Sequence, residues 1–141
     1  MSRVFWDTNL FIYLLEDHGE LADRVETLLA RMKARGDQLY TSVLTLGEVL
    51  TRPLRENRMD LAAKYEATLS PPFAVLAPFD RGCARHYALL RQDKSIRAPD
   101  ALQLACAAHL GCDLFITNDD RLSRKVVPGI QFISSLERAF L

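Results

Sequence analysis

Val4-Phe5-Trp6-Asp7-Thr8-Asn9 is the stretch of sequence that decides the fold. Three apolar residues in a row, ended by three polar ones, are typical of a short buried strand followed directly by a helix. A continuous apolar run predicts a strand that is covered on both faces, as in parallel sheets with helices on each side. The opening residues therefore predict an α/β fold with residues 4–6 as an inner strand.

The rest of the chain alternates short apolar runs with helical periods. Further strands are predicted at residues 38–42, 73–76, 113–117 and 130–133, with a turn of helix after the last. Helical spacing predicts helices at residues 10–16, 21–35, 43–52, 61–69, 83–92 and 100–110, and Pro53 is expected to end or kink the third. Strands separated by helices imply right-handed crossovers and a parallel sheet. The sequence thus predicts a three-layer α/β/α sandwich with a parallel sheet of about five strands, residues 1–141 forming a single domain.

Length and charge exclude several classes of protein. A chain of 141 residues has the length of one domain. Lys and Arg number 18, as do Asp and Glu, so the net charge is zero, which argues against a polybasic nucleic-acid binder. No apolar run approaches the roughly 18 residues of a membrane span, and the N-terminus lacks the apolar core of a signal peptide. Three cysteines, an odd number, argue against a disulfide framework. We expect a soluble cytoplasmic protein without a membrane partner.

Four acidic residues stand where a parallel sheet would gather them at one edge. Asp7 follows the first predicted strand and Asp119 follows the fourth, while Glu48 and Asp100 lie in the early turns of two helices. Open α/β sheets bind ligands outside the carboxyl ends of their strands. No basic residue stands within Asp7-Thr8-Asn9 or between Thr117 and Asp120 to neutralise these acids. We expect a cleft that is crowded with negative charge.

Such crowding indicates metal-assisted phosphoryl chemistry. Carboxylates in one cleft repel each other, and a hard divalent cation such as Mg²⁺ relieves the repulsion and activates phosphodiester attack. Each acid also has a structural interpretation: Asp7 as a helix cap, Asp100 as a partner of a helix dipole, Glu48 as a solvated side chain and Asp119-Asp120 as a turn. The joint pattern, rather than any one acid, favours the functional interpretation.

The same residues resemble the four signature blocks of the PIN domain family. The blocks are DTN at residues 7–9, LGEVL at residues 46–50, PDALQLA at residues 99–105 and TNDDRL at residues 117–122. The resemblance spans residues 4–122, and the compact length most resembles the VapC-type toxins of toxin–antitoxin pairs. It implies an endoribonuclease that depends on Mg²⁺ or Mn²⁺, with an RNA substrate, a cognate antitoxin and a homodimeric assembly.

The resemblance also implies roles for single residues. The catalytic acids map to Asp7, Glu48, Asp100 and Asp119, and the metal ligands to Asp7, Asp100 and Asp119. Asp119 is favoured over its neighbour Asp120 because it directly follows Thr117-Asn118. Substrate-binding residues are expected at Asn9, Thr117 and Arg97. Other basic residues near the acids are expected either to hold RNA phosphates or to form a solvated face: Arg52, Arg55, Arg91 and Lys94.

Two other functions remain open at this point. One is a PIN-like interaction module without catalytic activity, which would be favoured if one of the four acids were replaced, and none is. The other is an aspartate-based phosphatase or receiver-like domain. That class expects a second acid within two residues of its nucleophile and a lysine at a later strand end, whereas the sequence offers Thr8-Asn9 and Arg121.

Overall fold

β1 (Arg3–Trp6) lies in the middle of a five-stranded sheet, as the opening residues predict. The computed structural model describes residues 1–16 and 19–139. The strand order is β3-β2-β1-β4-β5, and each of the four pairings is parallel. The other strands are β2 (Gln38–Ser42), β3 (Val75–Ala77), β4 (Leu114–Thr117) and β5 (Phe132–Ser135).

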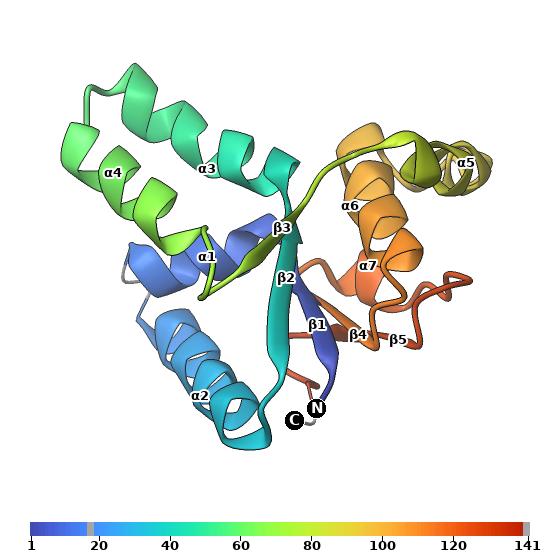
Figure 1. Ribbon diagram of the computed structural model, residues 1–141, viewed down its shortest axis with the longest axis horizontal. Coiled ribbons are helices and arrows are strands. Elements are labelled where there is room, and N and C mark those ends of the chain that lie inside the picture. The colour runs from blue at the N-terminus through green and yellow to red at the C-terminus, as the bar shows by residue number, and fades with distance from the viewer. Residues whose placement is uncertain (17–18, 140–141) are drawn as a thin grey trace.

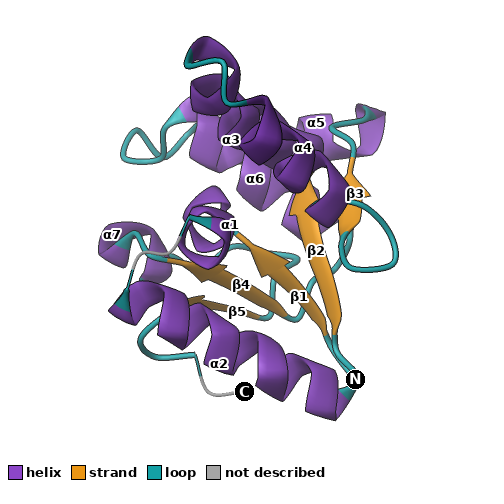
Figure 2. Cartoon of the chain, turned by 90° about the vertical axis from the view of Figure 1, so that its left-hand side faces the viewer, coloured by secondary structure: helices purple, strands orange, loops and turns teal. Residues whose placement is uncertain are grey.

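Helices cover both faces of this sheet and make the outer two layers. α1 (Thr8–Leu15), α2 (Glu20–Arg35), α3 (Val43–Arg55) and α4 (Met59–Thr68) lie on one face, drawn in front of the strands in Figure 2. α5 (Arg81–Leu90), α6 (Ala98–His109) and α7 (Asp120–Ser123) lie on the other, to the right of the sheet in Figure 1. The predicted three-layer α/β/α sandwich is confirmed. Within the described residues, no helix is long and apolar enough to span a membrane.

The core is divided by the sheet, because successive strand residues point to opposite faces. Val4 and Trp6 of β1 pack with α1 to α4, whereas Phe5 packs with α5 to α7. All three side chains are fully buried, and Phe5 stacks on Phe115 of β4 with ring centroids 5.2 Å apart. Phe5 and Trp6 therefore belong to the core and present no surface on which a nucleobase could stack.

Several predicted boundaries differ from the structure. α3 continues two residues beyond Pro53 to Arg55, because a proline removes only its own backbone N–H bond and the Glu56 N–H still bonds to the Arg52 carbonyl. β3 begins at Val75 rather than at residue 73, and β5 begins at Phe132 rather than at residue 130. After β5 the chain forms a hydrogen-bonded turn at residues 136–138 instead of a helical turn.

Strand order places the ligand-binding edge of the sheet. β1 leads to β2 on one side, whereas β4 returns on the other side of β1, so the order reverses between β1 and β4. A crevice opens at such a switch point outside the carboxyl ends of the two strands. Receiver-like domains use the order 2-1-3-4-5, which this sheet does not have. The topology argues against that alternative and directs attention to the residues that follow Trp6 and Thr117.

Candidate active site

A pocket of about 320 Å³ opens at the switch point. Its lining combines the segments that follow β1 and β4 with the first two turns of α1, α3 and α6: Asp7, Thr8, Asn9, Glu48, Arg97, Pro99, Asp100, Gln103 and Asp119. The structure therefore brings all four predicted acids to one place, together with Asn9 and Arg97. Of the basic residues considered above, Arg97 alone is part of this lining; Arg52 pairs instead with Glu56, and Arg91 donates to the Ile96 carbonyl.

Asp7 lies at the centre of the site and also caps a helix. One carboxylate oxygen accepts the Thr8 N–H at 2.9 Å at the start of α1, and the other accepts the Thr117 hydroxyl at 2.8 Å. The pKa of Asp7 is raised from 3.8 to about 6, chiefly by burial and to a smaller extent by the negative charges of Asp100 and Glu48, against the lowering effect of those two hydrogen bonds. Asp7 is thus both the predicted cap and a member of a crowded carboxylate group.

Glu48 reaches the pocket from the second turn of α3. Its Oε1 accepts the Thr8 hydroxyl at 2.6 Å and lies 3.5 Å from the Gln103 side-chain nitrogen. The residue is exposed rather than buried, yet these contacts hold its carboxylate against the first turn of α1. The structural interpretation of a freely solvated side chain does not describe Glu48.

Asp100 stands in the first turn of α6, behind Pro99. Its carboxylate is 3.6 Å from the Arg97 guanidinium, so a basic residue does approach the acids, contrary to the expectation of an unneutralised cleft. The expectation considered only the two strand-end segments, whereas Arg97, predicted as a substrate-binding residue, directly precedes α6. The Arg97 side chain is 72% exposed, however, and an exposed ion pair of this kind is worth only about 0–1 kcal/mol.

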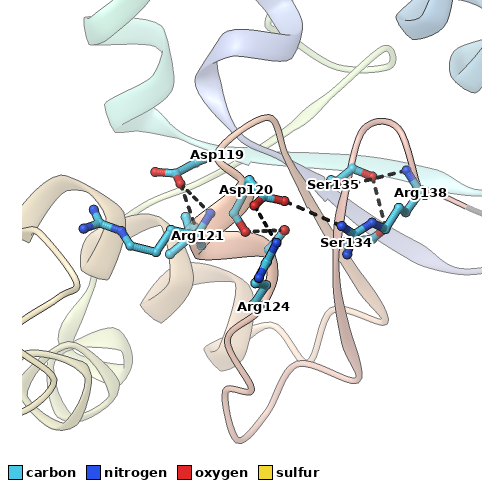
Figure 3. A network of polar contacts seen from close by, with 9 residues as sticks. Asp119, Asp120, Arg121, Arg124, Ser134, Ser135 and Arg138 are labelled. Atoms are coloured by element: carbon cyan, nitrogen blue, oxygen red, sulfur yellow. Dashed lines mark hydrogen bonds and ion pairs between the residues drawn. The ribbon is translucent and has the colours of Figure 1, made fainter.

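Asp119 and Asp120 are neighbours with different surroundings, as Figure 3 shows. Asp119 lines the pocket, and its Oδ1 accepts the backbone N–H groups of Arg121 and Leu122 at the start of α7. Asp120 points to the other side, toward Arg124 at 2.9 Å and Arg138 at 3.7 Å. Of the two neighbours, Asp119 alone is part of the described pocket lining, and its role as the fourth acid stays a prediction.

Thr117 and Asn9 occupy different depths. Asn9 is exposed on the pocket wall. Thr117 is fully buried and does not line the pocket. Its hydroxyl donates to Asp7 and accepts the Asp119 N–H at 3.0 Å, so Thr117 links the two acids that follow β1 and β4. This position suits a residue that orients the acids more than one that touches a substrate.

The donor set fits a hydrated divalent cation. Mg²⁺ prefers oxygen ligands and usually keeps several of its waters, so that one or two carboxylates are sufficient to bind it. Among the described residues, no three acidic, histidine or cysteine side chains are gathered tightly enough to enclose a metal ion by themselves. The carboxylates of Asp7, Asp100 and Asp119 line one pocket of about 320 Å³, a volume that can also hold such waters. Their role as ligands stays a prediction.

Sequence reasoning gave no role to Thr8 or Gln103, which also line the pocket. Gln103 is nevertheless a visible signal in the sequence, because it is the one polar side chain in the run ALQLACAA at residues 101–108 and lies one helical turn after Asp100. Thr8 gives no such signal, since a threonine after a helix cap is common.

Comparison with known proteins adds an independent line of argument. The model of the PIN domain family matches residues 4–127 of the chain. Comparison with curated protein sequences gives no match.

Several solved structures have the same fold. One is VapBC2 from Rickettsia felis bound to a DNA fragment from their promoter, with 19% identity and a TM-score of 0.76, covering 94% of this chain and 98% of that chain. Another is VapBC-5 from Mycobacterium tuberculosis, a member of the VapBC family of toxin–antitoxin systems, with 26% identity, a TM-score of 0.62 and coverage of 95% and 99%. FitAcB from Neisseria gonorrhoeae matches with 18% identity, a TM-score of 0.64 and coverage of 96% and 99%.

Proposed function

The chain belongs to the PIN domain family, and we propose that it is a metal-dependent endoribonuclease that acts as the toxin of a toxin–antitoxin pair. The observation that carries the proposal is the pocket at the switch point, in which four carboxylates from four separate segments of the chain face one space. A fold gains no stability by gathering like charges and raising the pKa of Asp7. Their chemistry explains why they are together.

Mg²⁺ or Mn²⁺ is the proposed cofactor. When bound, such an ion supplies positive charge that polarises an attacking water and stabilises the charge that develops on a phosphodiester. Asp7, Asp100 and Asp119 hold the ion, directly or through its waters. Glu48, which keeps Oε2 free of hydrogen bonds from the described residues, orients the water for attack on the phosphorus.

The remaining pocket residues bind or support the RNA. Arg97 is exposed and only loosely paired with Asp100, so its guanidinium can turn to a phosphate and bind it through two N–H groups. The side-chain amide of Asn9 can form a hydrogen bond to the same RNA strand. Thr117, which the sequence analysis expected to bind substrate, is assigned to holding Asp7 and Asp119, because its side chain is completely buried.

A cleavage assay with matched variants tests the chemistry. The wild type should cut RNA in Mg²⁺ or Mn²⁺ and lose this activity in excess EDTA. Asp100→Asn should reduce cleavage by orders of magnitude. Asp60→Asn is its control, because Asp60 also stands in the first turn of a helix and pairs with a preceding arginine, Arg58, but lies outside the pocket. Full cleavage in EDTA, or equal cleavage by Asp100→Asn and Asp60→Asn, would overturn the proposal.

Metal binding to the same three proteins tests the non-catalytic alternative. If the chain is only an interaction module, titration calorimetry should detect no Mn²⁺ binding and the wild type should not cut RNA. If it is the proposed enzyme, Mn²⁺ should bind to the wild type and bind more weakly to Asp100→Asn, with Asp60→Asn unchanged.

The proposed partners follow from the toxin assignment. The similar VapBC-5 belongs to a family of toxin–antitoxin systems, and we extend from it a cognate antitoxin for this chain. We further propose that this antitoxin places an arginine or lysine among the acids, and that the chain is a homodimer in the cytoplasm. Induced expression of the chain alone should stop growth, and co-expression of a neighbouring antitoxin gene should restore it. Light scattering should give twice the mass of one chain. A monomer that is harmless when expressed alone would contradict the toxin assignment.

A further inference from the structure

A layer of buried polar side chains lies directly beneath the pocket. It consists of Thr8, Thr41, Ser42, Thr45 and Gln103, which we call the polar layer. Four of the five are at most 2% exposed, and Thr8 and Gln103 also line the pocket. Buried polar groups are costly unless hydrogen-bonded, and each member has at least one such bond. An apolar layer would avoid this requirement, so the polar layer calls for an explanation.

Ser42 fixes the orientation of the Gln103 amide. The Ser42 hydroxyl oxygen accepts the Thr45 N–H as the cap of α3, and its proton is donated to Gln103 Oε1 at 2.5 Å. Gln103 Nε2 then faces Thr45 at 2.7 Å and Thr8 at 3.2 Å. A flipped amide would place its oxygen beside the carboxylate of Glu48 and leave the Ser42 proton without its acceptor.

The hydrogen bonds of the polar layer converge on Glu48. Gln103 Nε2 donates to the Thr8 hydroxyl oxygen, and the Thr8 hydroxyl donates its own proton to Glu48 Oε1 at 2.6 Å. Gln103 Nε2 also lies 3.5 Å from the same carboxylate oxygen. Oε1 is therefore held by the protein, and Oε2 is left to face the pocket. An exposed glutamate on a helix would otherwise exchange among several side-chain rotamers.

We propose that Gln103 is a positioning residue, whose amide, oriented by Ser42, holds Glu48 in one arrangement at the pocket through Thr8 and Thr45. The catalytic part of this inference rests on the proposed nuclease function. Gln103 does not itself touch the RNA; it acts through Glu48. Partners that orient the residues of a metal site typically contribute 10–100-fold to activity or metal affinity.

Cleavage kinetics provide the first test. Gln103→Met keeps the length of the side chain but removes the amide, and should lower kcat by about 10–100-fold with little change in KM. Gln103→Glu should lose as much activity, because a carboxylate cannot donate to Thr8 and repels Glu48.

Leu104→Ala is the control. Leu104 is fully buried on the same helix, in the core that contains Phe5, so this variant should have a lower melting temperature but the wild-type kcat. In a Glu48→Gln background, Gln103→Met should cause no further loss. A Gln103→Met protein with the wild-type kcat would overturn the inference while the nuclease function stands.

A second measurement needs neither metal nor RNA. In metal-free protein, NMR should show the two Gln103 side-chain N–H signals well separated and slow to exchange with solvent. Glu48→Gln should shift these signals and accelerate their exchange, whereas Glu56→Gln, on the same helix but paired with Arg52, should leave them unchanged. Gln103 signals that do not respond to Glu48→Gln would overturn the contact. A responsive Gln103 in a wild type that cuts no RNA would instead overturn the proposed function and leave the contact standing.

Discussion

Acidic residues have different surroundings at the two ends of the strands, which we call the amino edge and the carboxyl edge of the sheet. At the amino edge, before β2, Asp37 accepts the Ser2 N–H at 2.8 Å and the Arg35 guanidinium at 2.9 Å. Before β4, Asp113 accepts the Arg3 N–H at 2.8 Å. Each of these acids has partners of its own and fastens the start of the chain to a neighbouring strand. At the carboxyl edge, four acids share one pocket, in which Arg97 is the sole cation among the described lining residues.

The acids at the amino edge stabilise the fold, whereas the acids at the carboxyl edge destabilise it. A carboxylate bonded to a backbone N–H and a local cation stabilises the structure around it. Burial in the pocket, together with the negative charges of Asp100 and Glu48, raises the pKa of Asp7, and the ionised Asp7 therefore costs stability. Mutations of the acids should therefore have different consequences at the two edges. They should reduce RNA cleavage at the carboxyl edge and the free energy of unfolding at the amino edge.

The largest expected effect is the loss of RNA cleavage in Asp7→Asn. This change removes the central charge of the pocket while keeping the shape of the side chain. A loss of several kcal/mol of charge stabilisation corresponds to a rate reduction on the order of 10³. Single-turnover cleavage in Mg²⁺ would measure it, with Asp37→Asn from the amino edge as the matched control. Equal rates for the two variants would remove the distinction between the edges.

The second effect is the contribution of Asp7 to the pH dependence of stability. Its pKa is about 6 in the folded protein and 3.8 ordinarily, so the folded state binds more protons between these values. The free energy of unfolding therefore falls as the pH rises from about 4 to about 6, by up to about 3 kcal/mol for a shift of this size.

Urea unfolding in EDTA across this pH window would measure that dependence. Other carboxylates titrate in both proteins, so the informative quantity is the difference between Asp7→Asn and the wild type. The variant should gain relative stability as the pH rises. If the difference between the two free energies of unfolding stays constant from about pH 4 to about pH 6, the ionisation of Asp7 does not destabilise the folded protein.

The third effect belongs to the amino edge. Asp37→Asn removes the charge that pairs with Arg35 and weakens the acceptor for the Ser2 N–H, and the Asp37 side chain is completely buried. Hydrogen bonds to charged groups contribute about 1.5–3 kcal/mol, so the free energy of unfolding should fall by about 2 kcal/mol. Cleavage by the folded variant should equal that of the wild type. A variant as stable as the wild type would mean that this pair contributes nothing to the fold.

The carboxyl edge could be predicted from the sequence because its signals are local. An apolar run that ends in Asp7 is visible without a structure, and parallel strands bring such ends to one edge. Asp119 could be predicted by the same reasoning, because it follows the apolar run of β4. The predicted α/β/α sandwich needed only the alternation of strands and helices.

Features that depend on pairing or on distant contacts could not be predicted in this way. Ile130 is apolar and suggests a strand, but its N–H bonds to Val127 in a turn, and the pairing of Phe132 with Leu114 begins β5 two residues later. α7 is too short for a helical period to be recognised in the sequence. The contact between Gln103 and Glu48 joins residues 55 apart in the chain, so only the fold reveals it.

The smallest expected effect is that of Asp120→Asn, which tests the comparison within a single pair of neighbours. Asp120 is 63% exposed and pairs with Arg124 and Arg138, which are 66% and 64% exposed. Solvent screens such pairs, so the loss of both should change the free energy of unfolding by less than about 1 kcal/mol. Because Asp120 points away from the pocket that Asp119 lines, cleavage should remain at the wild-type rate. Thermal melts and cleavage rates of Asp120→Asn and Asp119→Asn, measured side by side, check both statements. If Asp120→Asn loses cleavage and Asp119→Asn keeps it, the fourth acid of the site is Asp120, and α7 must turn by one residue when the site is in use.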